Sequence, residues 1–206
     1  GARISLGVGL SATAIDVFVG LMIGGVTGFI GGKSDLIIQR FVDGWMTFPG
    51  LLLLLTIMSL VGQGILQIIL ILGISGGIGG SRVVRGAVIG IKENDYFLAA
   101  GALGSPTITT LRRHVLPNIM PVLIIIFSIS VGGVIIAEAS LSFLGFGLPA
   151  NIPSWGGMLS REGRRYMEMA PWLALYPGLA LTITVYSLNM LGDAMRDLLD
   201  PRLRGG

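Results

Sequence analysis

Long apolar runs separated by short charged segments form the main pattern of this chain. No charged residue occurs in residues 44–81, 115–137 or 169–192. About 20 apolar residues are enough for a helix to cross the hydrocarbon core of a bilayer, so each run is long enough to span a membrane. The pattern therefore predicts an all-α membrane protein.

We expect five membrane-spanning helices, at residues 4–30, 41–61, 65–89, 120–144 and 172–191. The longest uncharged run is divided by "GQG" at residues 62–64, which predicts a hairpin between the second and third helices. A turn at "GGKSD" precedes the second helix, and a loop rich in glycine and proline occupies residues 145–171. Pro49 and Pro177 each remove a backbone donor within a span, and each is expected to act as a hinge or as a static bend.

The distribution of basic residues predicts the orientation of these helices. Ten of the 14 Lys and Arg residues fall on one face of the membrane, whereas the other face receives four, Arg3, Arg161, Arg164 and Arg165. By the positive-inside rule the face with ten is cytoplasmic. The polar segment 93–117 and the C-terminus are then cytoplasmic, and the 145–171 loop is external.

Composition supports the membrane class and narrows the possible chemistry. Hydrophobic residues make up 52% of the chain and charged residues 12%, against about 25% charged in soluble domains. The chain has no cysteine and one histidine, so no disulfide, thiolate chemistry or side-chain metal site is predicted. Nucleic-acid binding is not expected either, because the basic residues form no stripe with interleaved aromatics.

No catalytic site is predicted. Hydrolysis inside a membrane needs a nucleophile and a base at one depth. Ser140 and Ser142 lie near the outer end of the fourth span, whereas His114 precedes its inner end, about 30 Å away along a helix. The "GGKS" stretch at residues 31–34 has Thr27 where a phosphate-binding loop needs its first glycine, so ATP binding there is not expected.

Two acidic residues are expected within the bilayer, Asp16 in the middle of the first span and Glu138 in the outer half of the fourth. An ionised carboxylate at that depth costs several kcal/mol unless it is paired or hydrated. Each acid therefore lines a wet pathway or makes an interhelical hydrogen bond that fixes the packing. The first alternative would also fit a stand-alone secondary transporter or channel, although no internal repeat supports that class.

The polar segment 93–117 carries clear helix signals. Asn94 is expected to cap a first helix that ends at Gly104, and Ser105 to cap a second helix with Pro106 at its first position. A face of small residues bordered by an aromatic ring and a leucine is formed by Tyr96, Ala99, Ala100 and Leu103. This face suits either a partner that approaches closely or packing on the membrane domain of the chain itself.

Several stretches resemble the permeases of ABC importers in the dipeptide, oligopeptide and nickel branch. "DYFLAAGALGSPTITTLRRHVLPN" is similar to the EAA loop of these permeases, which contains a short cytoplasmic coupling helix. Further similar stretches are "GARISL", "AEASLSFLGFGLP", "PSWG", "APWLALYPGLA" and "NMLGDAMRDLLDPRLR". The resemblance implies a type I ABC-importer transmembrane domain over residues 1–206. The family has one more span at the N-terminus, which this sequence is expected to lack.

In such importers two permease subunits form the pathway, two ABC ATPase subunits bind ATP and Mg, and an external solute-binding protein delivers the substrate. The resemblance implies that this chain forms half of a pathway for di- or oligopeptides. It would lie among the lipids of a bacterial or archaeal plasma membrane, the inner membrane in Gram-negative cells. The chain itself would bind no cofactor and catalyse no reaction. A nickel importer of the same family remains an alternative.

The resemblance also assigns roles to particular residues. It implies that the ATPase docks on a coupling helix comprising Asp95, Tyr96, Leu98, Ala99, Ala100, Leu103 and Gly104. Supporting positions in the loop are Arg113, His114, Leu116 and Pro117. Leu98 stands where the family has the glutamate that gives the loop its name. We therefore expect apolar contact to replace any ion pair made by that acid.

Overall fold

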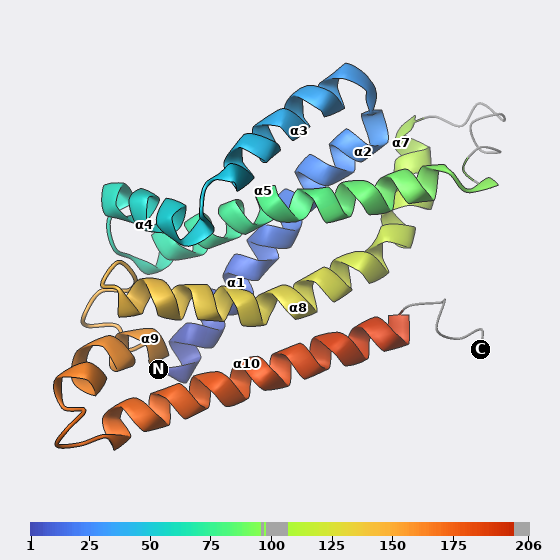
Figure 1. Ribbon diagram of the computed structural model, residues 1–206. Helices are drawn as coiled ribbons and strands as arrows, with labels where there is room; N and C mark the ends of the chain where they lie inside the picture. Colours follow the sequence, from blue (N-terminus) through green and yellow to red (C-terminus); the bar gives the residue numbers. More distant parts are fainter. Residues whose placement is uncertain (96, 98–106, 200–206) are drawn as a thin grey trace.

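The computed structural model is a bundle of long helices and describes residues 1–95, 97 and 107–199 (Figure 1). Its helices are α1 (Ala2–Gly20), α2 (Val26–Ile30), α3 (Gly32–Thr47), α4 (Gly50–Val61), α5 (Ile65–Lys92), α7 (Thr107–Thr110), α8 (Leu116–Phe143), α9 (Trp155–Met158) and α10 (Trp172–Leu199). In the described part of the chain, three π-helical turns adjoin them, η1 (Leu21–Gly25), η2 (Leu111–Val115) and η3 (Leu159–Gly163). The described residues include no β-strand.

Among the described residues, four helical segments are long and apolar enough to cross a membrane, at residues 2–30, 65–92, 116–143 and 172–199. They confirm the first, third, fourth and fifth predicted spans. The second predicted span is two helices, α3 and α4, whose axes differ by 90°. The predicted turn at "GGKSD" is confirmed at Gly31 and Gly32, which both have positive φ, but it is shorter than expected because α3 already begins at Gly32. Pro177, in contrast, lies inside α10, which continues past it to Leu199.

The long helices pack as a central layer crossed by α1. In Figure 1, α5, α8 and α10 run along the bundle, α8 between the other two, and α1 crosses behind α5 and α8. The 145–171 loop, which contains α9 and η3, closes one end beside the N-terminus. α8 contributes buried residues to all three hydrophobic clusters of the core, for example Ile119, Ile135 and Leu141.

Small residues let the first span approach α5 closely. Positions four residues apart face one another across the contact: Gly20, Gly24 and Gly28 on the first span, and Gly73, Gly77 and Ser81 on α5. A Cβ added at Gly77 would lie 2.6 Å from the carbonyl oxygen of Asp16, and one at Gly24 would overlap the carbonyl oxygen of Ser81. Such close backbone contact is how helices associate in lipid, where burying apolar surface gives little driving force.

Large apolar side chains remain exposed on the outside of the bundle. Leu36, Ile37 and Phe41 on α3 are each more than half exposed, as are Ile183 and Tyr186 on α10. Monomeric soluble proteins rarely leave such extended apolar surface in water. These faces therefore suit lipid or other apolar protein surfaces.

Candidate functional site

The chain breaks abruptly between α3 and α4, at Phe48 and Pro49. Proline lacks a backbone N–H and forces the residue before it into an extended conformation. Phe48 accordingly has φ −78° and ψ 138°, and α4 restarts at Gly50 at 90° to α3. The bend expected at Pro49 is therefore confirmed, as a break between two helices.

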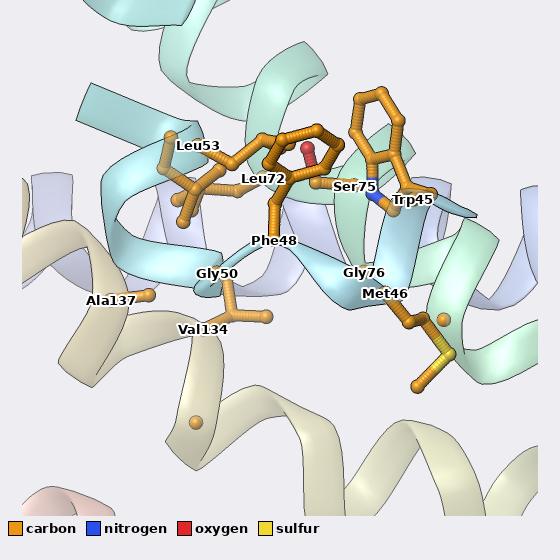
Figure 2. Close-up of a pocket in the computed structure, with 13 residues that line it drawn as sticks. Trp45, Met46, Phe48, Gly50, Leu53, Leu72, Ser75, Gly76, Val134 and Ala137 are labelled. Carbon is orange, nitrogen blue, oxygen red and sulfur yellow. The ribbon is translucent and has the colours of Figure 1, made fainter. Parts of the chain in front are cut away.

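A cavity of about 380 Å³ lies at this break, between α3, α4, α5 and α8 (Figure 2). Its lining comes from Trp45, Met46, Phe48, Gly50, Leu53, Leu54, Leu72, Ser75, Gly76, Gly79, Gly133, Val134 and Ala137. Figure 2 shows the rings of Trp45 and Phe48 on the same side as Ser75, while Val134 and Ala137 of α8 lie on the other side. Among the described residues of this lining, Ser75 supplies the only side-chain oxygen, so the lining is mainly apolar.

Asp16 lies directly behind one wall of this cavity. It is 7% exposed, and its carboxylate carbon and Oδ2 lie 3.0 Å from the place that a Cβ on Gly76 would take. Within the described part of the chain, the carboxylate makes no hydrogen bond and no ion pair. No described side-chain oxygen is fully buried without a partner, so both oxygens of Asp16 reach accessible space.

Glu138 is the second acid at membrane depth, and it is completely buried. The hydroxyl of Ser142 donates to its Oε1 at 2.8 Å, and the hydroxyl of Ser5 donates to its Oε2 at 3.4 Å. Ser5 Oγ in turn accepts from the backbone N–H of Trp155 at 3.1 Å, and Ser142 Oγ accepts from that of Leu148 at 3.3 Å. The Glu138 cluster therefore ties α1, α8 and the 145–171 loop together.

Ion pairs join α3 to α5 at the basic end of the bundle. Arg85 binds Asp35 through two bonds, Nε to Oδ1 at 2.7 Å and Nη2 to Oδ2 at 2.6 Å, and Arg82 binds Asp43. Lys92 Nζ donates to the carbonyl oxygen of Phe29 at 2.8 Å. Sequence reasoning missed the two ion pairs because their partners are 50 and 39 positions apart.

The structure describes only part of the 93–117 segment. Asn94 Nδ2 donates to the carbonyl oxygens of Gly90 and Ile91, both at 3.1 Å. Its side chain thus closes α5, whereas the sequence predicts that it caps the following helix. Asp95 is helical and exposed. The remaining residues assigned to the coupling helix lie outside the described residues: Tyr96, Leu98, Ala99, Ala100, Leu103 and Gly104. Ser105 and Pro106 also lie outside them.

The described supporting positions lie just before α8 and in its first turn. Arg113 and His114 belong to η2, and Arg113 is exposed. Leu116 and Pro117 begin α8, four residues before the start of the fourth predicted span. Val115, between these pairs, is buried in the cluster that joins α5 to α8.

The long helices form a multi-span bundle with a broken helix, an apolar cavity at the break and polar links between helices. Together these features define a polytopic membrane protein. The chain belongs to the family described as the binding-protein-dependent transport system inner membrane component, whose model matches residues 19–205. This confirms the resemblance found in the sequence.

Curated relatives agree with this family. The chain is 38% identical over 204 residues to the oligopeptide transport system permease protein OppC of Bacillus subtilis, an alignment that covers 99% of this chain and 67% of OppC. It is 39% identical to the dipeptide permease protein DppC of the same organism, covering 99% of this chain and 64% of DppC. It is 37% identical to the glutathione permease protein GsiD of Pectobacterium atrosepticum, covering 99% and 67%. The chain thus spans about two thirds of the length of these relatives.

A solved structure confirms the fold. A chain of the MetNI methionine ABC transporter in an inward-facing conformation matches with a TM-score of 0.77 and 19% identity, over 97% of this chain and 94% of that one. The expected fold, the transmembrane domain of a type I ABC importer, is therefore shown. These comparisons support a permease and give no support to a stand-alone transporter or channel.

Proposed function

We propose that this chain is a permease subunit that forms half of the translocation pathway of an ATP-driven importer for di- or oligopeptides. One observation carries the proposal: 99% of the chain aligns at 37–39% identity with permease proteins named for oligopeptides, dipeptides and glutathione. The cavity at the α3–α4 break supports it, because aromatic and aliphatic walls suit the side chains of small peptides.

The importer would contain a second permease subunit, two ABC ATPase subunits and an external solute-binding protein. ATP and Mg bind to the ATPase subunits in this proposal, so the chain itself needs no cofactor and is not an enzyme. The bundle would lie in the plasma membrane with residues 93–117 and the C-terminus in the cytoplasm. Support comes from the basic residues Arg82, Arg85 and Lys92, which lie in the last turns of α5, just before that segment.

The 93–117 segment is where ATP-driven movement would enter this chain. α5 runs without interruption from the cavity at Gly76 to Lys92, which is roughly 24 Å along a helix. A partner that moved the coupling helix would therefore move one wall of the cavity with it. Rigid-body movement of packed helices is a common way of switching between two states. We infer that such movement alternates the access to the pathway.

The test is reconstitution of the complete importer in lipid vesicles. We expect uptake of radiolabelled dialanine to require ATP, the binding protein and both ATPase subunits. Ala99→Trp combined with Ala100→Trp should abolish the stimulation of ATP hydrolysis by the loaded binding protein. Gly86→Ala is the matched control, because a Cβ at this exposed position of α5 meets no atom within 4 Å.

Two results would overturn the proposal. The first is peptide uptake by this chain alone, without ATPase subunits. The second is full stimulation of ATP hydrolysis in an assembled complex that carries both tryptophans. Bulky side chains at these two positions would then not disturb docking, so the ATPase would not dock on this face.

A further inference from the structure

We propose that Asp16 and the cavity at the α3–α4 break form a subsite for the ammonium group of a transported peptide. Asp16 supplies the negative charge, and Trp45 and Phe48 supply an aromatic wall. This inference rests on the proposed function, because it names a recognition element for the same substrate class.

The first reason is that Asp16 lacks a partner within the described chain. More than nine-tenths of the residue is buried, yet its carboxylate makes no hydrogen bond or ion pair there. The basic residues of α5 are engaged elsewhere, since Arg82 binds Asp43, Arg85 binds Asp35 and Lys92 binds a backbone carbonyl. An ionised carboxylate at membrane depth is unfavourable unless a cation or water meets it. The neighbouring α5 thus leaves this position free for a cation from outside the chain.

The second reason is the position of Gly76. This glycine lines the cavity, and it is also the residue against which the Asp16 carboxylate lies. A Cβ at position 76 would lie 3.0 Å from Oδ2 and 3.3 Å from Oδ1 of Asp16. Gly80, one turn further along α5, leaves similar room, with a Cβ position 3.4 Å from Oδ1. Side chains that would cover the carboxylate on the α5 side are therefore absent at both positions.

The third reason is the chemistry of the cavity wall. Trp45 and Phe48 both line it, and aromatic faces attract ammonium groups. The rest of the wall is aliphatic or glycine apart from the Ser75 hydroxyl, which suits apolar side chains. A divalent cation would need several oxygen ligands, and Ser75 is the only oxygen-bearing side chain among the described residues of the wall. The site therefore fits an organic ammonium ion with apolar substituents rather than a metal ion.

The negative charge assigned to Asp16 can be tested by comparing how fast a cationic and an anionic reagent modify a cysteine at position 75. This chain has no cysteine, so Ser75→Cys introduces its only thiol. We would measure the rates at which aminoethyl methanethiosulfonate, a cation, and sulfonatoethyl methanethiosulfonate, an anion, modify the thiol in the assembled importer. The partner subunits would first have their cysteines replaced. Adding Asp16→Asn should lower the cation-to-anion rate ratio by about ten-fold, since one nearby charge is removed.

Two controls keep this test decisive. Asp193→Asn removes an exposed acid of α10 and should leave the ratio unchanged. Gly79→Cys provides a second reporter in the same wall, because a Cβ there meets no atom within 4 Å. Either reporter can be used, provided that the variant assembles into the importer. If Asp16→Asn leaves the cation-to-anion rate ratio unchanged, Asp16 does not supply the negative charge of the subsite.

Protection by peptides tests the identity of the ligand. N-acetylation of alanyl-phenylalanine amide replaces its ammonium group by a neutral amide and adds a small acetyl group. We expect the peptide with the free amine to slow modification of the Ser75→Cys thiol when Asp16 is present. With Asp16→Asn, the affinity of this peptide, measured from the protection, should fall by about ten-fold. Equal protection by the two peptides overturns the ammonium subsite.

Uptake of dialanine by the otherwise unaltered importer reports separately on the proposed function. Uptake without charge selectivity at Ser75 would overturn the subsite alone. Charge selectivity without any peptide uptake would overturn the peptide as the ligand, together with the proposed function.

Discussion

Asp16 and Glu138 are both acids at membrane depth, on helices that pack against each other, yet their surroundings are opposite. Serine hydroxyls from α1 and α8 donate to Glu138. Asp16 faces glycines of α5, which offer neither a side-chain donor nor cover. The neighbouring side chains, rather than the depth in the membrane, therefore determine the role of each acid. Glu138 holds the bundle together, whereas Asp16 is available to a partner from outside the chain.

The largest effect is expected at Glu138. Glu138→Ala removes the acceptor of two hydroxyls and leaves a void among buried residues. We expect the free energy of unfolding to fall by about 3 kcal/mol, because the change leaves a cavity in the core and two buried hydroxyls without their acceptor. Denaturant titration of the purified importer in mixed micelles measures this. Glu138→Gln keeps one acceptor oxygen and should lose less, so equal stability of the two variants would contradict the bonded arrangement.

Ser5 is the next test of the Glu138 cluster. Ser5→Ala removes a donor to Glu138 and the acceptor of the Trp155 N–H, so it weakens the link between α1 and the loop. We expect a loss of about 1 kcal/mol in the same titration. Ser140→Ala is the matched control, because that hydroxyl bonds only to the Ile136 carbonyl of its own helix. A loss at Ser140 as large as that at Ser5 would show that the link between elements is not the cause.

Gly76 tests the space beside Asp16. Gly76→Ala places a methyl group 3.0 Å from the carboxylate, which forces one of the two to shift. We expect a cost of about 1 kcal/mol in the free energy of unfolding, typical of mild overpacking. Gly86→Ala on the same helix has open space and should be neutral or stabilising, because alanine favours helix. If the two variants had the same free energy of unfolding, close packing against Asp16 would not require a glycine at position 76.

The spans were predictable because each depends on local composition alone. Runs of about 20 apolar residues between charges mark four helices that the structure confirms. Pro49 likewise indicated a bend from its own chemistry. α3 begins at Gly32, nine residues before the predicted second span, because its first turns carry Lys33, Asp35 and Arg40 and so contain no uncharged run. Its ion pairs with Arg82 and Arg85 on α5 were not predictable either. A single sequence gives no signal for pairings 39 and 50 positions apart.

The two acids show the same limit within the candidate site. The sequence placed both at membrane depth but left pathway and packing open for each. Ser5 is 133 positions from Glu138, so nothing local indicated their hydrogen bond. For Asp16, the deciding neighbours are glycines on another helix, whose role as open space appears only when the helices are packed. Asn94 differs, because its side chain has backbone groups within reach on either side, and the pattern could not choose between them.

The smallest effect on stability is expected at Asp16 itself. Because the carboxylate makes no bond within the described chain, Asp16→Asn removes no stabilising contact and relieves the cost of a poorly hydrated charge. We expect the free energy of unfolding to change by less than about 0.5 kcal/mol, or to rise. The same acid-to-amide change at Glu138 supplies the comparison, because the amide that it introduces still has to be accommodated between two serine donors. If Asp16→Asn instead destabilised the importer as much as Glu138→Gln, Asp16 would be a packing residue like Glu138, and the contrast between the two acids would not hold.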